Sequence, residues 1–309
     1  IEAVQSVLAR GHDGHQVSVH MVDNASPDGS AATLQATAQT HNWGAQVTLY
    51  CEDVNHGFGR GNNVVLSALA AQVTPPDYVF LLNPDAQLKN DALAILVQFM
   101  DSHPNCAVAG TRAYNPGASD PVTAAFRFPS LPSVFSAALS FGPVARLLKN
   151  HAVPIGADLP TCEVDWVSGA ATLARFHVWQ DTGFFDPEFF LYYEEVELMY
   201  RTKQAGWTCW HVAEAEILHI EGASTDVRSA DNERKRRPAY WYHSWQYYFR
   251  KTHGRAYALA TAGAWVIGAA LNEGLARLRG VRPAAPRRVF REFWAAGVRP
   301  QQGQPPGPQ

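Results

Sequence analysis

The most constraining feature of this sequence is an alternation of apolar strand patterns and amphipathic helix patterns between residues 16 and 102. Strand patterns occupy residues 16–22, 46–51 and 78–82, and helix patterns occupy residues 30–40, 62–72 and 91–102. Strands that alternate with helices of about ten residues predict an α/β sheet whose strands are mostly parallel. Ligands bind beyond the carboxyl ends of such strands, so we expect functional residues directly after each strand.

The composition is that of a globular protein with room for about two domains. Apolar residues make up 47% of the 309 residues and charged residues 17%, which excludes collagen-like, disordered and coiled-coil classes. The four cysteines have no paired spacing, which predicts reduced, structural thiols in a cytosolic protein. The first eight residues show apolar spacing typical of a helix rather than of a signal peptide. No apolar run reaches the roughly 18 residues of a clear membrane span.

The net charge of −3 is the average of two unlike parts of the chain. Residues 1–225 hold 10 basic and 23 acidic side chains, whereas residues 226–309 hold 15 basic and 5 acidic ones. Such asymmetry indicates a partner for the basic end, either nucleic acid or an anionic membrane. We therefore predict a domain over residues 1–225, a basic and aromatic helical extension over 226–298, and a disordered low-complexity tail over 299–309.

Polar clusters follow the three predicted strands, at residues 23–30, 55–63 and 83–86. Each cluster alone is compatible with turn chemistry, and Ser30 could be a helix N-cap, but three successive strand ends favour a site. The glycines at 57, 59 and 61 lack the spacing of a dinucleotide fingerprint. A close approach to phosphates at the following helix N-terminus remains plausible. Asp85 suits Mg²⁺ or Mn²⁺ bound to a diphosphate, or an Asx turn after Pro84.

The second half of the sequence supplies candidate reacting groups. Glu194, Glu195 and Glu197 open a helix pattern that continues to about residue 205. Acids suit the first turn of a helix, and Glu197 can pair with Arg201. Glu194 and Glu195 follow a run of aromatic residues, where desolvation would raise a carboxyl pKa towards that of a useful base. His219, in the strand pattern of residues 217–220, is either a core histidine or a metal ligand, depending on whether Asp85 is nearby.

Seven segments, in this order, resemble the family 2 glycosyltransferases of the GT-A fold, most closely the branch that includes bacterial rhamnosyltransferases. The segments are VDNASPDGS, NHGFGRGNN, FLLNPDA, DWVSGA, GFFDPEFFLYYEEVEL, AGW and ILHIEGAS, and the resemblance covers residues 1–254. It implies an α/β fold with a mostly parallel central sheet, flanking helices and a C-terminal helical extension. The family's first strand has no counterpart here, because residue 1 already matches the following helix. We interpret the chain as a fragment of a longer protein, the alternative being a fold without that strand.

The resemblance also implies inverting transfer of a sugar from a nucleoside-diphosphate donor, with roles for individual residues. Glu195 is the implied catalytic base, with Glu194 next, although the family usually has Asp at the position of Glu195. Asp85 and His219 are the implied ligands of Mg²⁺ or Mn²⁺. The implied acceptor-side residues are Trp166 and Gly169. The implied donor-binding residues are Asp23, Asn24, Gly59, Asn62, Asn63, Asn83 and Asp85.

The basic end interleaves basic and aromatic side chains over residues 230–255, a pattern shared by nucleic-acid binding and membrane interfaces. Residues 256–271 are uncharged and arginines follow, which favours an interfacial helix on an anionic leaflet. The alternative is a helix packed on the catalytic domain, with a solvated basic tail.

With the resemblance, these features predict a cytoplasmic enzyme, peripheral on the inner face of the plasma membrane, with no nucleic-acid partner. We expect dTDP-rhamnose or a UDP-hexose as donor and a lipid-linked or polysaccharide acceptor in cell-envelope glycan synthesis. Two other classes stay open: a nucleotide-sugar-binding protein or fragment without catalysis, and a nucleic-acid-binding module.

Overall fold

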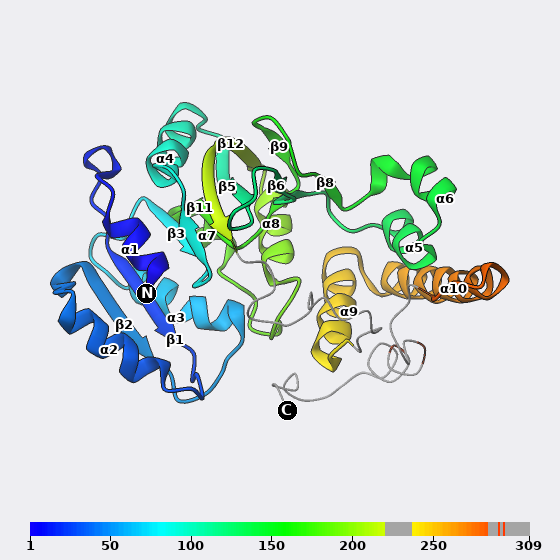
Figure 1. The fold of residues 1–309 in the computed structure, drawn as a ribbon, viewed down its shortest axis with the longest axis horizontal. Coiled ribbons are helices and arrows are strands. Elements are labelled where there is room, and N and C mark those ends of the chain that lie inside the picture. Colours follow the sequence, from blue (N-terminus) through cyan, green and yellow to red (C-terminus); the bar gives the residue numbers. More distant parts are fainter. Residues whose placement is uncertain (220–236, 284–289, 291–292, 294–309) are drawn as a thin grey trace.

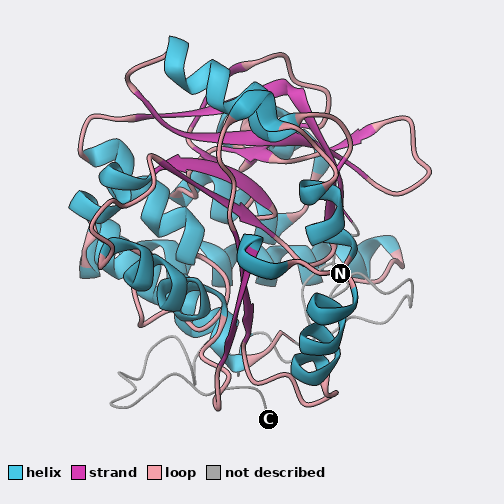
Figure 2. Cartoon of the chain, turned by 90° about the vertical axis from the view of Figure 1, so that its left-hand side faces the viewer, coloured by secondary structure: helices cyan, strands magenta, loops and turns pink. Residues whose placement is uncertain are grey.

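A computed structural model describes residues 1–219, 237–283, 290 and 293, and it shows an α/β fold with strands between helices (Figures 1 and 2). The α-helices are α1 (Glu2–Leu8), α2 (Ser30–Thr40), α3 (Phe58–Ala70), α4 (Ala92–Ser102), α5 (Leu131–Leu139), α6 (Gly142–Leu147), α7 (Phe176–Thr182), α8 (Glu194–Gln204), α9 (Ala239–His253) and α10 (Arg255–Arg279). Short 3₁₀ helices are η1 (His12–Gly14), η2 (Gly44–Gln46) and η3 (Lys149–His151). The strands are β1 (Val19–Asp23), β2 (Val47–Cys51), β3 (Tyr78–Leu82), β4 (Ala86–Leu88), β5 (Cys106–Tyr114), β6 (Pro121–Val122), β7 (Ala125–Phe126), β8 (Pro154–Gly156), β9 (Cys162–Val164), β10 (Trp166–Val167), β11 (Ala171–Arg175) and β12 (Thr208–His219).

The main sheet is mixed, so the prediction of a mostly parallel sheet is wrong in this respect. Its strand order is β3-β11-β5-β12-β4, with β6 beside β5 and β9 beside β12. The strands β3, β5 and β12 share one direction, whereas β11 and β4 run against their neighbours. The first residue of β11, Ala171, pairs with the last residue of β3, Leu82. Because β11 enters the sheet at the carboxyl end of β3, it has to run in the opposite direction.

The strands β1 and β2 form a separate parallel pair, in register from Val19 opposite Val47 to Asp23 opposite Cys51. The helices α2 and α3 pack against this pair, as the alternation of strand and helix patterns predicts. A further small sheet, in the order β10-β7-β8, precedes β11 in the chain. Within the described residues, β3 is therefore an edge strand of the main sheet.

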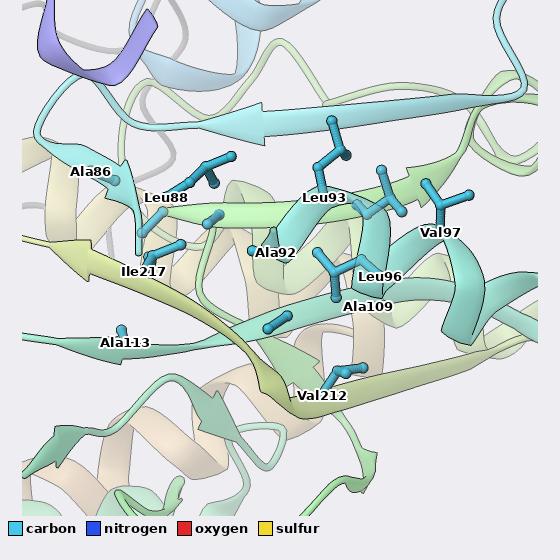
Figure 3. Packing of buried hydrophobic residues seen from close by; sticks show 14 of the residues in the cluster. Ala86, Leu88, Ala92, Leu93, Leu96, Val97, Ala109, Ala113, Val212 and Ile217 are labelled. Carbon is cyan, nitrogen blue, oxygen red and sulfur yellow. The ribbon is translucent and has the colours of Figure 1, made fainter. Parts of the chain in front are cut away.

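Small side chains in the centre of the main sheet let helices pack closely on it. The first four residues of β5, Cys106 to Ala109, are fully buried. The helix α4 lies on one face of the sheet and contributes Leu93, Leu96 and Val97 to the core (Figure 3). The other face packs against Leu66 of α3 and side chains of α7 and α8. Such close packing fixes the strand ends, at which the candidate site lies, relative to one another.

The predicted C-terminal helices are present as α9 and α10. They form a third cluster of buried side chains with α5 and α8, which includes Phe189 and Val196 beside the candidate site. Figure 1 shows α10 at the opposite end of the molecule from α2. No helix among the described residues is long and apolar enough to cross a membrane. The predicted tail, residues 299–309, lies outside the described residues, and the domain boundaries stay predictions.

Candidate active site

Asp85 and His219 lie together at the ends of β3 and β12, as a shared metal site requires. The ladder between β4 and β12 places Ala86 opposite His219, and Oδ1 of Asp85 is 3.4 Å from Nε2 of His219. This Oδ1 atom is buried and has no hydrogen-bond partner among the described residues. A carboxylate oxygen beside an imidazole nitrogen fits Mg²⁺ or Mn²⁺. Within the described part of the chain, no group of three or more His, Cys, Asp or Glu side chains could hold a metal ion.

Glu194 and Glu195 begin α8 directly after a constrained turn. Tyr192 and Tyr193 have φ values of 69° and 70°, a left-handed conformation that bulky residues rarely adopt. Glu194 is 3% exposed, and Oε2 of each glutamate is shielded from solvent without a partner. Burial, together with the charge of Glu195, raises the pKa of Glu194 well above its usual value. Burial also raises the pKa of Glu195 above its usual value, in the direction that makes a carboxylate a stronger base.

The loop between β10 and β11 connects the carboxylate pair to the end of β3. The backbone N–H of Asn83 donates to the carbonyl of Ala170 at 2.8 Å. A Cβ atom at Gly169 would lie 3.5 Å from the Phe58 ring and 4.0 Å from Cβ of Glu195. The structure thus brings together Gly169, Glu195 and the strand end that precedes Asp85, as the resemblance implied.

The glycine loop before α3 packs against the segment that precedes α8. The backbone N–H of Phe58 donates to the carbonyl of Phe190 at 3.1 Å. A Cβ atom at Gly59 would lie 2.9 Å from Cβ of Phe185 and 3.5 Å from Cβ of Glu194. The need for glycine at position 59 therefore comes from close packing beside the carboxylate pair. Donor contact by Gly59 stays a prediction.

Three predicted donor residues use their side-chain amides in local hydrogen bonds: Asn24 and Asn63 hold loops in place, and Asn62 bonds within α3. Asn24 accepts from the N–H of His56 at 3.0 Å and donates to the carbonyl of Gly57 at 3.0 Å. Asn63 donates to the carbonyl of Phe185 at 2.7 Å and accepts from its N–H at 3.1 Å. Asn62 donates to the carbonyl of Phe58 at 2.9 Å. These bonds give the three residues a positioning role, and their contact with a donor stays a prediction.

The remaining predicted residues also have local partners. Asp23 ends β1, is 6% exposed and accepts from the N–H of Ser26 at 3.3 Å. The carbonyl of Asn83 accepts from the N–H of Ala86 at 3.0 Å, which closes the turn around Asp85. The indole of Trp166 donates to the carbonyl of Arg127 at 3.0 Å and stacks on the ring of Phe126. Nothing in these contacts tests donor or acceptor binding.

A network of ion pairs beside α8 contains Asp186 and Lys251, which were not predicted as functional residues. The fully buried Glu197 accepts from Nε of Arg201 at 2.7 Å, which confirms the predicted pair, and Nζ of Lys251 lies 2.8 Å from the same oxygen. Lys251 also lies 2.5 Å from Oδ2 of Asp186. Burial alone would raise the pKa of Asp186, but hydrogen bonds from the Lys251 ammonium, the backbone N–H of Glu188 and the Tyr247 hydroxyl lower it overall. The network fastens α9 to the helix that carries the two candidate bases.

Replacing Gly57 with Ala is expected to destabilise the protein by about 3 kcal/mol or more. Gly57 has φ 80° and ψ 179°, which only glycine adopts readily, and a Cβ atom there would lie 1.9 Å from the carbonyl oxygen of Phe190. The matched control is Gly29→Ala, because φ is 79° and nothing lies within 4 Å of its Cβ position. That variant should lose only about 1 to 2 kcal/mol. Urea unfolding measures both, and equal losses would contradict the packing argument.

Replacing Glu194 with Gln is expected to stabilise the protein increasingly as the pH rises above 4.5, the usual Glu pKa. When folding raises the pKa of a group, the contribution of that group to the free energy of unfolding is fully present below the pKa of the unfolded state. This contribution is lost as the pH rises through the pKa of the folded state. Gln cannot ionise, so at high pH the free energy of unfolding of the variant should exceed that of wild type by about 1 to 3 kcal/mol. Unfolding midpoints at pH 4 and pH 8 measure the effect. The control is Asp120→Asn, at an exposed loop position, and a pH-independent difference for Glu194→Gln would refute the expectation.

Comparison with known proteins shows which family this chain is similar to. Residues 1–151, nearly half of the chain, match the family model described as Glycosyl transferase family 2. The chain is a glycosyltransferase, and its fold is the GT-A fold of the solved glycosyltransferases described below.

Curated relatives of this glycosyltransferase include two rhamnosyltransferases. The N-acetylglucosaminyl-diphospho-decaprenol L-rhamnosyltransferase of Mycobacterium tuberculosis is 29% identical over 231 residues, which cover 68% of this chain and 68% of the relative. Rhamnosyltransferase WbbL of Escherichia coli is 26% identical over 176 residues, which cover 56% of this chain and 64% of the relative.

Solved structures support the fold of the glycosyltransferase. The mannosyltransferase PcManGT from Pyrobaculum calidifontis, in complex with GDP-Man and Mn²⁺, superposes with a TM-score of 0.53 and 16% identity over 97% of this chain and 76% of that one. GalNAc-T7 with UDP, GalNAc and Mn²⁺ gives a TM-score of 0.52 and 13% identity over 71% of this chain. The glycosyltransferase spans 40% of the length of GalNAc-T7.

Proposed function

We propose that this glycosyltransferase moves a sugar, with rhamnose as the first candidate, from a nucleoside-diphosphate donor to a hydroxyl group of a lipid-linked or polysaccharide acceptor, with inversion at the anomeric carbon. The observation that carries the proposal is the placement of Glu195 next to Gly169, one loop away from the Asp85–His219 pair. In this proposal, the proton acceptor and the diphosphate–metal site are joined through the loop that contains Gly169 and Ala170.

The reaction needs one base and a stabilised leaving group. The carboxylate of Glu195 would take the proton of the acceptor hydroxyl. At the same time, the oxygen of that hydroxyl would bond to the anomeric carbon, and the bond between the anomeric carbon and the diphosphate would break. A divalent cation held by Asp85 and His219 would supply charge compensation for the departing diphosphate. A Cβ atom at position 169 would lie in ordinary van der Waals contact with Phe58 and Glu195, which places Gly169 directly beside the proposed base. One displacement with one base inverts the configuration.

The choice of rhamnose and of a lipid-linked acceptor rests on the relatives. Both curated relatives are named rhamnosyltransferases, and the mycobacterial one is named for a decaprenol-linked acceptor. The cytoplasmic face of the plasma membrane is the location we infer for such a reaction. The proposed donor nucleoside is dTDP or UDP.

A donor screen tests the proposal. The protein would be incubated with dTDP-rhamnose, UDP-glucose, UDP-N-acetylglucosamine and GDP-mannose, each with Mn²⁺ or Mg²⁺ and with N-acetylglucosaminyl-diphospho-polyprenol. The expected result is release of nucleoside diphosphate and formation of a glycosylated lipid from dTDP-rhamnose only, and NMR of the product should show inverted anomeric configuration. Saturable donor binding without product would support the non-catalytic alternative, and a retained configuration would exclude Glu195 as the base of a single displacement.

A further inference from the structure

The helix α10 is fixed to the protein along one side. Asn272 donates to the carbonyl of Leu139 at 2.9 Å, and a Cβ atom at Gly268 would lie 2.9 Å from the carbonyl oxygen of Phe135. Trp265 is buried against α9 and the side chain of Phe293. Because α5 and α9 cover this side, the orientation of the opposite side is also fixed.

The opposite side of α10 is exposed and almost free of polar groups. Leu259, Ile267 and Leu271 are 60%, 57% and 49% exposed, and their spacing of four and eight residues places them on one face. The other exposed positions between residues 256 and 274 are all Ala or Gly: Ala256, Ala260, Gly263, Ala270 and Gly274. A helix on the surface of a soluble protein normally turns charged and polar residues to water. The exposed face of α10 instead turns apolar residues to water over about five turns.

Basic residues stand at both ends of this apolar face. Arg255 begins α10, and exposed Arg277 and Arg279 end it. The guanidinium of Arg279 lies 4.8 Å from the ring centre of Phe141, at the start of α6. Residues 237–283 contain seven basic side chains, and Glu273 is the one acidic residue in that range. Glu273 is itself paired with Arg277 at 3.2 Å.

We propose that this face of α10 docks on the surface of an anionic lipid bilayer. Apolar side chains would enter the boundary between headgroups and acyl chains, and the flanking arginines would meet lipid phosphates. A second copy of the chain fits less well, because a two-fold pairing across this face would set arginines of one copy against arginines of the other. The helix lies on the membrane in this proposal, in keeping with the lack of a spanning helix among the described residues.

The docking surface goes beyond the proposed reaction and needs neither donor nor acceptor. It lies at the end of the molecule occupied by α5, α6 and α10, away from β1, β2 and α2 (Figure 1). An enzyme held in this way would meet acceptors that reside in the membrane while its nucleotide-binding end stays in water. That consequence depends on the proposed function, whereas the binding itself does not.

Vesicle co-sedimentation tests the docking surface. Vesicles of phosphatidylcholine mixed with phosphatidylglycerol are compared with vesicles of phosphatidylcholine alone, using wild type, a triple variant Leu259→Gln, Ile267→Gln and Leu271→Gln, and a double variant Arg277→Gln and Arg279→Gln. We expect wild type to bind the anionic vesicles, and both variants to bind at least about tenfold more weakly. Binding of wild type should also weaken as salt rises.

The matched control is Val73→Gln, because Val73 is a fully exposed apolar residue in the loop after α3; it should bind as wild type does. Melting curves and turnover on a soluble acceptor should be unchanged in the triple variant, which separates docking from folding and from the proposed reaction. The proposal is wrong if wild type does not bind anionic vesicles, or if the triple variant binds them as tightly as wild type does. A wild-type dimer that the triple variant converts to a monomer, without vesicle binding, would identify a second copy as the partner instead.

Discussion

Replacement of Glu195 with Gln is expected to lower kcat by about 10² to 10⁴-fold, the range of a lost general base. The dissociation constant of the donor should stay within about twofold, because the amide keeps the shape of the side chain and the base acts only when the acceptor is deprotonated. Burial raises the pKa of Glu195 above the usual 4.5. Wild-type kcat should therefore rise with pH through an apparent pKa above 4.5, and this acidic limb should be absent from the residual activity of the variant.

The neighbouring carboxyl group provides the matched control. Glu194 precedes Glu195 in the same helix turn and is buried, so Glu194→Gln makes the same chemical change one residue away. We expect kcat to fall by less than about tenfold in this variant, since Glu194 packs towards Gly59 rather than towards Gly169. A large loss in Glu194→Gln combined with a small loss in Glu195→Gln would transfer the role of the base to Glu194. The release of nucleoside diphosphate measures kcat, and titration with donor measures the dissociation constant of the donor. Both are measured over a series of pH values.

Local periodicity predicted most elements of the first hundred residues because each has its own apolar pattern, but it missed the short strand β4 (Ala86–Leu88). The helix Ser30–Thr40 and the strand Tyr78–Leu82 have the predicted bounds. The helix α3 begins at Phe58, four residues before the predicted start. Gly59 and Gly61 are typical of a loop when only local propensity is considered. In the structure they form the first turn of a helix that packs against Phe185 and Asn24, a requirement that comes from distant residues.

The central strands were harder to predict. The strand β5, Cys106–Tyr114, was missed, since its small residues show neither alternation nor β-branched enrichment. It is buried on both faces, and a Cβ atom at Gly110 would lie 2.5 Å from Cβ of Val167. The strand β12 extends over Thr208–His219, much longer than predicted. Its ladder with β5 is irregular between Val212 and Glu216, which interrupts the alternation that identifies a strand.

The candidate site was predicted where it depends on residue type and order, and missed where it depends on long-range pairing. The resemblance supplied Glu195, Asp85 and His219, but only the register of β4 with β12 brings the last two together. Lys251 lies more than fifty residues beyond Glu197 in the sequence, and no local pattern links it to α8. Non-local contacts of this kind follow from the packing of whole elements, which periodicity does not encode.

Replacement of Asp85 with Asn is expected to weaken Mn²⁺ binding at least about tenfold, because it removes a charged oxygen ligand. It should also lower kcat/KM by about 10²-fold or more, since compensation of leaving-group charge accounts for several kcal/mol of barrier lowering and each 1.36 kcal/mol is tenfold. Electron paramagnetic resonance of free Mn²⁺, in a titration of protein with dTDP present, measures binding without turnover. Chelation should abolish wild-type turnover, and added Mn²⁺ or Mg²⁺ should restore it.

Asp91→Asn is the matched control, because Asp91 lies in the same segment, is 70% exposed and makes an ion pair of 3.6 Å with Arg10. Its variant should bind Mn²⁺ and turn over as wild type does. The pairing of Asp85 with His219 also predicts that His219→Ala weakens Mn²⁺ binding without altering the affinity of metal-free protein for dTDP, since both residues act on the diphosphate through the cation. If chelated wild type keeps full turnover, or if Asp85→Asn keeps full Mn²⁺ affinity, the two side chains are not metal ligands. Their contact at 3.4 Å would then be an ion pair that only fastens β4 to the end of β12.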